Sequence, residues 1–304
     1  MSTFPTRIHS NAKLNLYLRV TGKINHYHVL DSVFVPLSLH DDIHIDYSNE
    51  NYDRCTLTLK YDQDITIYHY LPWKNTILKA LYCLRDKYGF KQYFDIDIQK
   101  YIPIGSGLGG ASSNAAAVIK KIVDMLQLNI SEEEMLQIGR EVGDDVPFFF
   151  FNKPCIAQGV GNVFVPLELS RDYKCIIVYP MVALYTVKIF KHYSENFTNN
   201  GEIKDDEVVP LEVFLQRLHG GELHASKGAV YNALTKSAAS FFPEIHSIVS
   251  FMKAWPDCVL SSMTGSGSTC FAIFDASQDI AHYCKILRDR YPNYLIKDID
   301  VKKV

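Results

Sequence analysis

The sequence lacks the long apolar runs and the paired cysteines that mark membrane or secreted proteins. No apolar run approaches the roughly 20 residues that a membrane-spanning helix requires, and the N-terminus has no apolar signal-peptide core. The seven cysteines are odd in number, scattered, and contain no Cys-x-x-Cys pair, which argues against disulfides and zinc clusters. We therefore expect a cytoplasmic protein.

An excess of charge of one sign is also absent. The formal net charge is -3 at pH 7, so the chain has no basic field for nucleic acid or anionic lipid. A local basic pocket for a small anion remains compatible with this balance. We expect a small-molecule substrate, with no nucleic acid, membrane or obligate protein partner.

What is present is an ordinary globular composition, with 47% hydrophobic and 21% charged residues. A chain of 304 residues exceeds the size at which one core grows easily, which favours two domains. Period-two alternation, or a short buried apolar run, predicts strands at 12–20, 32–37, 42–47, 55–59, 94–98, 175–178 and 270–274. Helical spacing and caps predict helices at 75–88, from about 110 for four turns, 131–143, 211–218, 230–241, 245–255 and 280–290.

Two further segments are not assigned by these regular patterns. The aromatic run 148–151 is expected to be a buried strand or a turn of a core helix, and the polar stretch 191–208 is expected to be a loop. We see no internal repeat. The alternation of strands and helices favours an α/β or α+β protein in two lobes.

A glycine and hydroxyl run at 103–117 joins a predicted strand to a predicted helix. Glycines bring backbone N–H groups close to an anion, and the helix adds its free N–H groups and dipole. The run therefore predicts a phosphate cradle, although a tight turn without a ligand is the simpler alternative. No Gly-Lys-Ser/Thr ends it, as a Walker A loop requires, and the acidic ribose anchor of a dinucleotide fold is missing.

Three other segments carry polar groups on otherwise apolar elements. Lys13 and Asn15 share one face of the first strand, Asp145 follows a helix, and residues 264–269 form a second glycine and hydroxyl turn. Each has an ordinary structural explanation: a solvated strand face, a turn or helix-capping aspartate, and a plain loop. Their combination carries the functional interpretation.

In order and spacing, the segments 12–16, 103–117, 144–147 and 264–267 resemble the signatures of the GHMP small-molecule kinases, and the resemblance extends from residue 12 to about 274. It implies an α+β two-lobed fold. The N-terminal ATP-binding lobe, residues 1–157, would contain a mixed sheet with helices. The C-terminal substrate-side lobe, residues 158–304, would be a ferredoxin-like α/β sandwich.

Within the family, Ala12–Leu16, the pair Tyr27 and His28, and the turn 158–161 resemble members that phosphorylate the 2-hydroxyl of a cytidine diphosphate-linked methylerythritol. That reaction is a step of the non-mevalonate (MEP) route to isoprenoids. The resemblance implies ATP as phosphoryl donor, with Mg²⁺ on its phosphates and no metal ligated directly by the protein. His26 and His28 lack a third ligand for a metal site.

The resemblance also implies residue roles. Asp145 would be the base for the substrate hydroxyl, with Lys13 beside it; Asp145 is preferred to Asp144 because it directly precedes Val-Pro. The implied ATP-binding residues are Asn75, near the adenine, and Pro103, Gly105, Ser106, Gly107, Leu108, Gly109, Gly110, Ala111, Ser112, Ser113 and Asn114. The implied substrate-binding residues are Asn15, Tyr27, His28, Thr186, Phe190, Thr264, Gly265, Ser266 and Gly267, with cytosine held between Tyr27 and Phe190.

One departure and two alternatives accompany this interpretation. Asn25 and His26 stand where relatives usually carry Asp-Gly, which bears on the turn that presents Tyr27. The acceptor could instead be that of another GHMP kinase, such as homoserine or mevalonate. A non-catalytic nucleotide-binding protein is the third alternative, and the retention of both Lys13 and Asp145 argues against it.

Overall fold

The structure is a computed structural model that describes residues 6–25, 27–63, 65–69, 71, 75–161, 163–199, 202–203, 208–223 and 229–303. The chain forms two compact units, each assembled from several segments. Unit 1 consists of Met1–Ala12, Leu39–Ile104 and Gly109–Asn152, and unit 2 consists of Lys13–Ser38, Gly105–Leu108 and Lys153–Val304. The long strands β1 (Thr6–Ile24) and β2 (Tyr27–Tyr47) each contribute to both units.

Unit 1 contains a mixed sheet. The strands are β3 (Arg54–Leu59), β4 (Ile65–His69) and β5 (Phe94–Lys100), together with parts of β1 and β2, in the order β4-β3-β5-β2 with β1 paired to β2. β3 runs parallel to β5, whereas β2 pairs antiparallel with β5 and β4 pairs antiparallel with β3. Residues along β5 alternate between buried and partly exposed, as the sequence pattern predicts for a sheet with one covered face.

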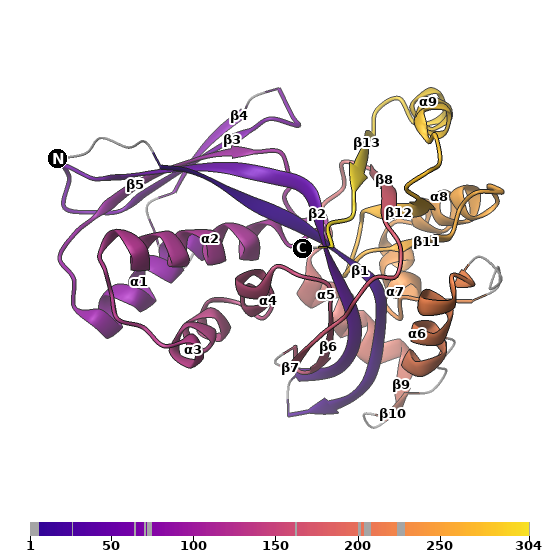
Figure 1. Ribbon diagram of the computed structural model, residues 1–304, viewed down its shortest axis with the longest axis horizontal. Helices are drawn as coiled ribbons and strands as arrows, with labels where there is room; N and C mark the ends of the chain where they lie inside the picture. The colour runs from indigo at the N-terminus through magenta and orange to yellow at the C-terminus, as the bar shows by residue number, and fades with distance from the viewer. Residues whose placement is uncertain are drawn as a thin grey trace. The chain divides into compact units, whose positions relative to one another are not determined.

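The helices of unit 1 cover that face of the sheet. They are α1 (Thr76–Tyr88), α2 (Gly110–Met125), α3 (Glu132–Val142) and α4 (Val146–Phe151), and Figure 1 shows α1, α2 and α3 on one side of β3 and β5. The predicted ends of α1 and α3 are confirmed. Gly89 ends α1 with a left-handed φ of 68°, and Ser131 and Glu134 form the capping box of α3.

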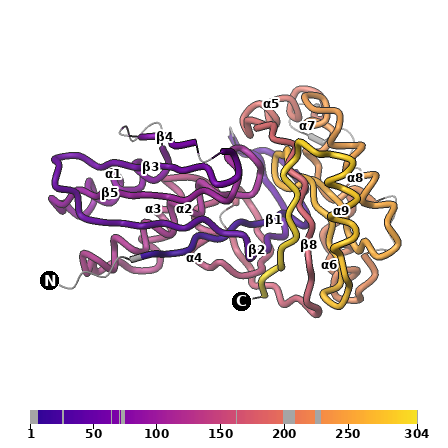
Figure 2. Tube along the Cα trace, turned by 90° about the horizontal axis from the view of Figure 1, so that it is seen from above, coloured from indigo at the N-terminus to yellow at the C-terminus, as the bar shows by residue number. Residues whose placement is uncertain are grey.

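Unit 2 is built around an antiparallel sheet in the order β11-β12-β8-β13. Its strands are β8 (Tyr173–Tyr179), β11 (Leu260–Met263), β12 (Cys270–Asp275) and β13 (Leu295–Asp300). Figure 2 shows β13 beside β8, where the two strands pair antiparallel. With helices between β8 and β11 and between β12 and β13, this order is that of a ferredoxin-like sandwich, as predicted.

The remaining elements of unit 2 surround this sheet and the first half of β2. Two short strands, β6 (Cys155–Gly159) and β7 (Val163–Pro166), extend β2. The helices are α5 (Thr186–Phe197), α6 (Leu211–Gly220), α7 (Thr235–Phe241), α8 (Glu244–Lys253) and α9 (Ala281–Arg290). Among the described residues, no helix is both long and apolar enough to cross a membrane.

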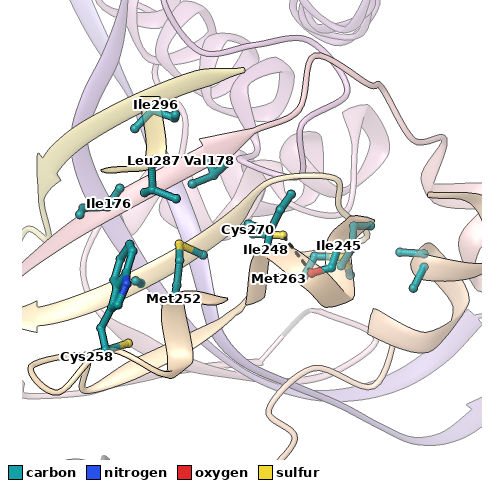
Figure 3. Close-up of a cluster of buried hydrophobic side chains, with 14 of the residues drawn as sticks. Ile176, Val178, Ile245, Ile248, Met252, Cys258, Met263, Cys270, Leu287 and Ile296 are labelled. Atoms are coloured by element: carbon teal, nitrogen blue, oxygen red, sulfur yellow. Dashed lines mark hydrogen bonds between the residues drawn. The ribbon is translucent and has the colours of Figure 1, made fainter. Parts of the chain in front are cut away.

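The core of unit 2 forms where α8 and α9 pack on the sheet. Figure 3 shows Ile248 and Met252 of α8 in one cluster with Cys270 of β12. Burial raises the pKa of the Cys270 thiol well above its ordinary value, so this cysteine acts as a small apolar side chain. All seven cysteines are described and all are free, as the sequence predicts.

Two predictions are corrected by the structure. The stretch 191–208 is not simply a loop, because α5 continues to Phe197 and is followed by the strands β9 (Thr198–Asn199) and β10 (Glu202–Ile203). Burial of Ile189 and Tyr193, one helical turn apart, fixes this helix despite its polar exposed face. Strands predicted separately at 32–37 and 42–47 are one continuous strand, β2. A single domain boundary between residues 157 and 158 stays a prediction.

Candidate active site

Lys13 is buried on β1 in unit 2. Its side chain is only 3% exposed, so the solvated strand face that is the ordinary place for a lysine does not apply here. The Nζ atom donates a hydrogen bond to Asn15 Oδ1 at 2.5 Å and lies 4.8 Å from the ring centre of Phe34. Lysine is seldom buried this deeply, which makes Lys13 a candidate for function.

Asn15 links Lys13 to a segment far away in the chain. Its Nδ2 donates to Ser32 Oγ at 2.9 Å, and Ser32 Oγ donates to the Tyr17 carbonyl at 2.6 Å. Its backbone N–H donates to Thr264 Oγ1 at 2.9 Å, across a separation of 249 residues. The structure thereby brings together the first and last of the segments that the sequence singled out.

The two glycine and hydroxyl turns also meet within unit 2. A Cβ added to Gly107 would lie 2.5 Å from the Thr264 carbonyl oxygen, and one added to Gly265 would lie 3.0 Å from the Gly107 carbonyl oxygen. Both residues have positive φ, 81° for Gly107 and 56° for Gly265. Glycine is therefore required here by the approach of the two backbones as well as by conformation.

Sequence reasoning missed Asn232, which holds the second turn. This residue is 1% exposed, and its Nδ2 donates to the carbonyl oxygens of Met263 at 2.7 Å and Gly265 at 2.9 Å. Its Oδ1 accepts from Leu234 N at 2.9 Å. An isolated asparagine in a helical pattern gave no signal, because its partners lie 31 and 33 residues away.

In unit 1, the cradle continues into α2. Gly109, with φ of 72°, precedes the helix and offers no side-chain cap to its first N–H groups. Those groups therefore remain available to an anion, as a phosphate site requires. Of the predicted contacts, Ala111 is exposed and Ser112 is partly exposed, while Ser113 is buried.

Asn114 is buried beneath the start of α2 in a polar network. Its Oδ1 accepts from Lys100 Nζ at 3.0 Å, and its Nδ2 donates to Ser10 Oγ at 2.5 Å and to Asp41 Oδ2 at 2.9 Å. Lys100 and Asp41 form an ion pair, and Asp41 Oδ1 accepts the backbone N–H groups of Tyr101 and Ile102. The Asn114 side chain is thus occupied in orienting the cradle.

Asp145 belongs to unit 1, at the start of α4, and makes no side-chain capping hydrogen bond to that helix. Asp145 thus occupies the turn before α4 and the N-cap position, but its side chain does not cap the helix. Partial desolvation raises the pKa of the neighbouring Asp144 carboxyl, and the charge of Asp145 raises it further, against the opposing charge of Lys79.

Asn75 caps α1. Its Oδ1 accepts from Ile77 N at 2.8 Å and from Leu78 N at 3.3 Å, and its Nδ2 donates to Cys55 Sγ at 3.7 Å. Pro103, in the same unit, is buried three residues after the end of β5. The Asn75 side chain therefore acts as the N-cap of α1. Its contact with adenine stays a prediction.

The predicted acceptor residues lie in unit 2. The ring centres of His28 and Phe190 are 4.8 Å apart, and His28 Nε2 is hydrogen-bonded to Ser194 Oγ at 2.7 Å. Partial burial lowers the pKa of His28 and the charge of Lys23 lowers it further, which favours the neutral form of the ring. Tyr27 is 59% exposed.

Two further features border this region. Thr186 Oγ1 and Ser266 Oγ are hydrogen-bonded at 2.9 Å, which joins the start of α5 to the second turn. Asn25 takes the left-handed conformation with φ of 55°, which asparagine tolerates better than most residues. His26, the other half of the departure from the Asp-Gly pair, lies outside the described residues.

Comparison with known proteins decides the family. The profile of the GHMP kinases N terminal domain matches residues 75–153, and that of the GHMP kinases C terminal domain matches residues 218–293. The 4-diphosphocytidyl-2-C-methyl-D-erythritol kinase of Bacteroides thetaiotaomicron is 33% identical over 280 residues, which cover 90% of this chain and 92% of that protein. The chain belongs to the GHMP kinases. It is therefore a kinase, as the sequence predicts.

Other members of the GHMP kinases support the same conclusion. The enzyme of that name from Thermodesulfovibrio yellowstonii is 31% identical over 275 residues, with 88% of this chain and 89% of that protein covered. A crystal structure of 4-(cytidine 5'-diphospho)-2C-methyl-D-erythritol kinase superposes with a TM-score of 0.72 at 24% identity, covering 98% of this chain and 100% of that one. The homoserine kinase of Cytophaga hutchinsonii superposes with a TM-score of 0.68 at 13% identity, covering 100% of this chain and 96% of that one. These superpositions confirm the predicted GHMP kinase fold.

Proposed function

We propose that this GHMP kinase transfers the γ-phosphoryl group of ATP to the 2-hydroxyl of 4-diphosphocytidyl-2-C-methyl-D-erythritol, a step of the MEP pathway. The observation that carries the proposal is the similarity, over about nine tenths of the chain, to relatives that bear this substrate in their names. The matched profiles fall within residues 1–157 and 158–304, which supports a donor lobe and an acceptor-side lobe with that division.

The ATP phosphates would be held by backbone N–H groups of residues 105–114 and the start of α2. The uncapped first turn of that helix supports this assignment, because its N–H groups need an acceptor. The cradle offers glycines, hydroxyls and N–H groups but no carboxylate, which fits a Mg²⁺ ion carried by the phosphates. When bound, Mg²⁺ neutralises charge on the phosphate oxygens. Asn75 would lie near the adenine.

Phosphoryl transfer depends on positioning and charge more than on covalent chemistry. Asp145 would accept the proton of the substrate hydroxyl, and the ammonium of Lys13 would stabilise negative charge on the transferred group. The hydrogen bond from Lys13 to Asn15 supports this role, because it fixes the direction of the buried ammonium. Thr264, through the backbone of Asn15, ties this arrangement to the second turn.

The acceptor would be recognised through its cytosine. Tyr27 offers an exposed aromatic face, and Phe190 lies against His28. With Nε2 of His28 hydrogen-bonded to Ser194, the Nδ1 atom would be the one to form a hydrogen bond with the edge of the base. Thr186 and residues 264–267 would contact the remainder of the acceptor. With its seven free thiols, the protein would work in a reducing cytoplasm.

An ADP-release assay tests the proposal. Purified protein with Mg-ATP is given the cytidine-linked acceptor, homoserine or mevalonate in parallel, and we expect ADP release above background only with the first. Release with homoserine or mevalonate alone would reassign the acceptor within the family. Folded protein that binds ATP but turns over none of the three would instead indicate a non-catalytic nucleotide-binding protein.

A further inference from the structure

Two histidines and an aspartate converge on one face of unit 1, apart from the residues assigned above. His9 lies on β1, and His40 and Asp42 lie two residues apart on the paired strand β2, so they point to the same face. His9 Nδ1 is hydrogen-bonded to Asp42 Oδ1 at 2.7 Å, and His40 Nε2 lies 3.7 Å from the same oxygen. The three potential donor atoms lie within 4.8 Å of one another.

These spacings are close to those of a metal centre. With metal–ligand bonds of about 2.0–2.1 Å, a tetrahedral zinc site has ligand atoms roughly 3.3 Å apart. The separations of 2.7 Å and 3.7 Å from Asp42 Oδ1 lie on either side of that value. Small side-chain rotations would therefore place an ion between the three donors without movement of the strands.

The burial of the three residues also suits an ion that enters from solvent. The Asp42 side chain is 7% exposed, whereas those of His9 and His40 are 56% and 39% exposed. Arg7 pairs with Oδ2 of Asp42, which leaves Oδ1 as the oxygen shared by the two imidazoles. A ligating carboxylate is usually hydrogen-bonded by a second residue in this way. The positive charge of Arg7 repels a cation, so we expect the affinity for a metal ion to be moderate.

We propose that His9, His40 and Asp42 bind one divalent transition-metal ion of the zinc class, with solvent completing its coordination. Two imidazole nitrogens and one carboxylate oxygen suit Zn²⁺, whereas Mg²⁺ prefers oxygen ligands and would stay with the nucleotide. The ion joins β1 to β2 and stabilises their pairing in unit 1. The sequence did not suggest the site, because His9 and Asp42 are 33 residues apart.

Calorimetric titration of Zn²⁺ into metal-free full-length protein tests the site, in excess Mg²⁺ and without nucleotide. We expect the wild type to bind one ion, and His9→Ala and His40→Ala each to weaken binding by at least about tenfold, since even partners of ligands cost that much. His44→Ala is the matched control, because His44 lies on the same strand and pairs with Asp46 instead. Its affinity for Zn²⁺ should equal that of the wild type.

Thermal unfolding gives a second readout. Zn²⁺ should raise the unfolding midpoint of the wild type and of His44→Ala but not that of the double variant His9→Ala/His40→Ala. Glutamine replacements at both positions serve if an alanine variant fails to fold. Absence of Zn²⁺ binding by the wild type, or binding by a folded double variant as tight as that of the wild type, would overturn the proposal. No step uses the kinase substrates, so the result is independent of the proposed function.

Discussion

Asp145 is the residue whose replacement most directly separates phosphoryl transfer from ATP binding. Asp145→Asn keeps the shape of the side chain but removes its ability to take a proton. We expect kcat to fall by about 10²–10⁴-fold, the usual contribution of a general base, with little change in the affinity for ATP. Steady-state kinetics and ATP titration measure the two quantities. Unchanged turnover would show that another group is the base, and Asp144→Asn is the matched variant for that case.

Asn232 allows a residue-scale test of the second turn. Asn232→Ala leaves the buried carbonyl oxygens of Met263 and Gly265 without this donor, and each unsatisfied buried group costs about 1–3 kcal/mol. We expect a lower free energy of unfolding and a raised KM for the acceptor, measured by denaturant titration and kinetics. Asn196→Ala removes an exposed hydrogen bond to His192 and should change neither quantity measurably. Equal effects of the two variants would contradict this role of Asn232.

At the scale of elements, the contact between the two glycine turns predicts a strict requirement for Gly107. In Gly107→Ala the new Cβ would lie 2.5 Å from the Thr264 carbonyl oxygen in a backbone conformation with positive φ. Strained backbone of this kind costs about 1–3 kcal/mol, and the turn must move. We expect reduced stability and a loss of turnover.

The matched control is Gly22→Ala on β1. A Cβ at Gly22 would meet no atom within 4 Å. Its free energy of unfolding and its kinetic constants should remain close to those of the wild type. A Gly107→Ala enzyme that behaves like Gly22→Ala would show that the two turns do not need to approach so closely.

The buried pair of Lys100 and Asp41 joins β5, β2 and α2 at the base of the cradle. Lys100→Met would leave the Asp41 charge buried without its partner, which costs about 3–5 kcal/mol. The double variant Lys100→Met/Asp41→Asn should recover part of that loss in denaturant unfolding. Lys121→Met breaks an exposed pair with Asp124 and should cost about 0–1 kcal/mol. If the double variant lost the full sum of the free energies of unfolding that the two single variants lose, the result would contradict the pairing.

At the scale of the whole molecule, the sequence predicted the fold and most of its elements because local signals agree with the final structure. The capping box at Ser131 and the alternation along β5 are encoded within a few residues. The short strands β4, β6, β7, β11 and β13 were missed, because their pattern is weak until neighbouring strands supply the other half of the ladder. Tertiary burial of Ile189 and Tyr193 likewise overrode the polar composition of α5.

The candidate site was predicted in part for the same reason. Lys13, Asn15 and Thr264 were found through short motifs, and the structure confirms that they lie together in unit 2. Asn232 and the Lys100–Asp41 pair gave no local signal, because their partners are remote in the chain. The roles of the individual residues stay predictions that the variants above test.

The acceptor and the hydroxyl that receives the phosphoryl group define the proposed activity. Phosphorus NMR of the reaction of wild-type protein with Mg-ATP and 4-diphosphocytidyl-2-C-methyl-D-erythritol tests it most directly. We expect a new phosphate monoester at the 2-hydroxyl, formed together with ADP and absent with Asp145→Asn. A wild-type reaction that yields no phosphorylated product, or one phosphorylated at another hydroxyl, would contradict it.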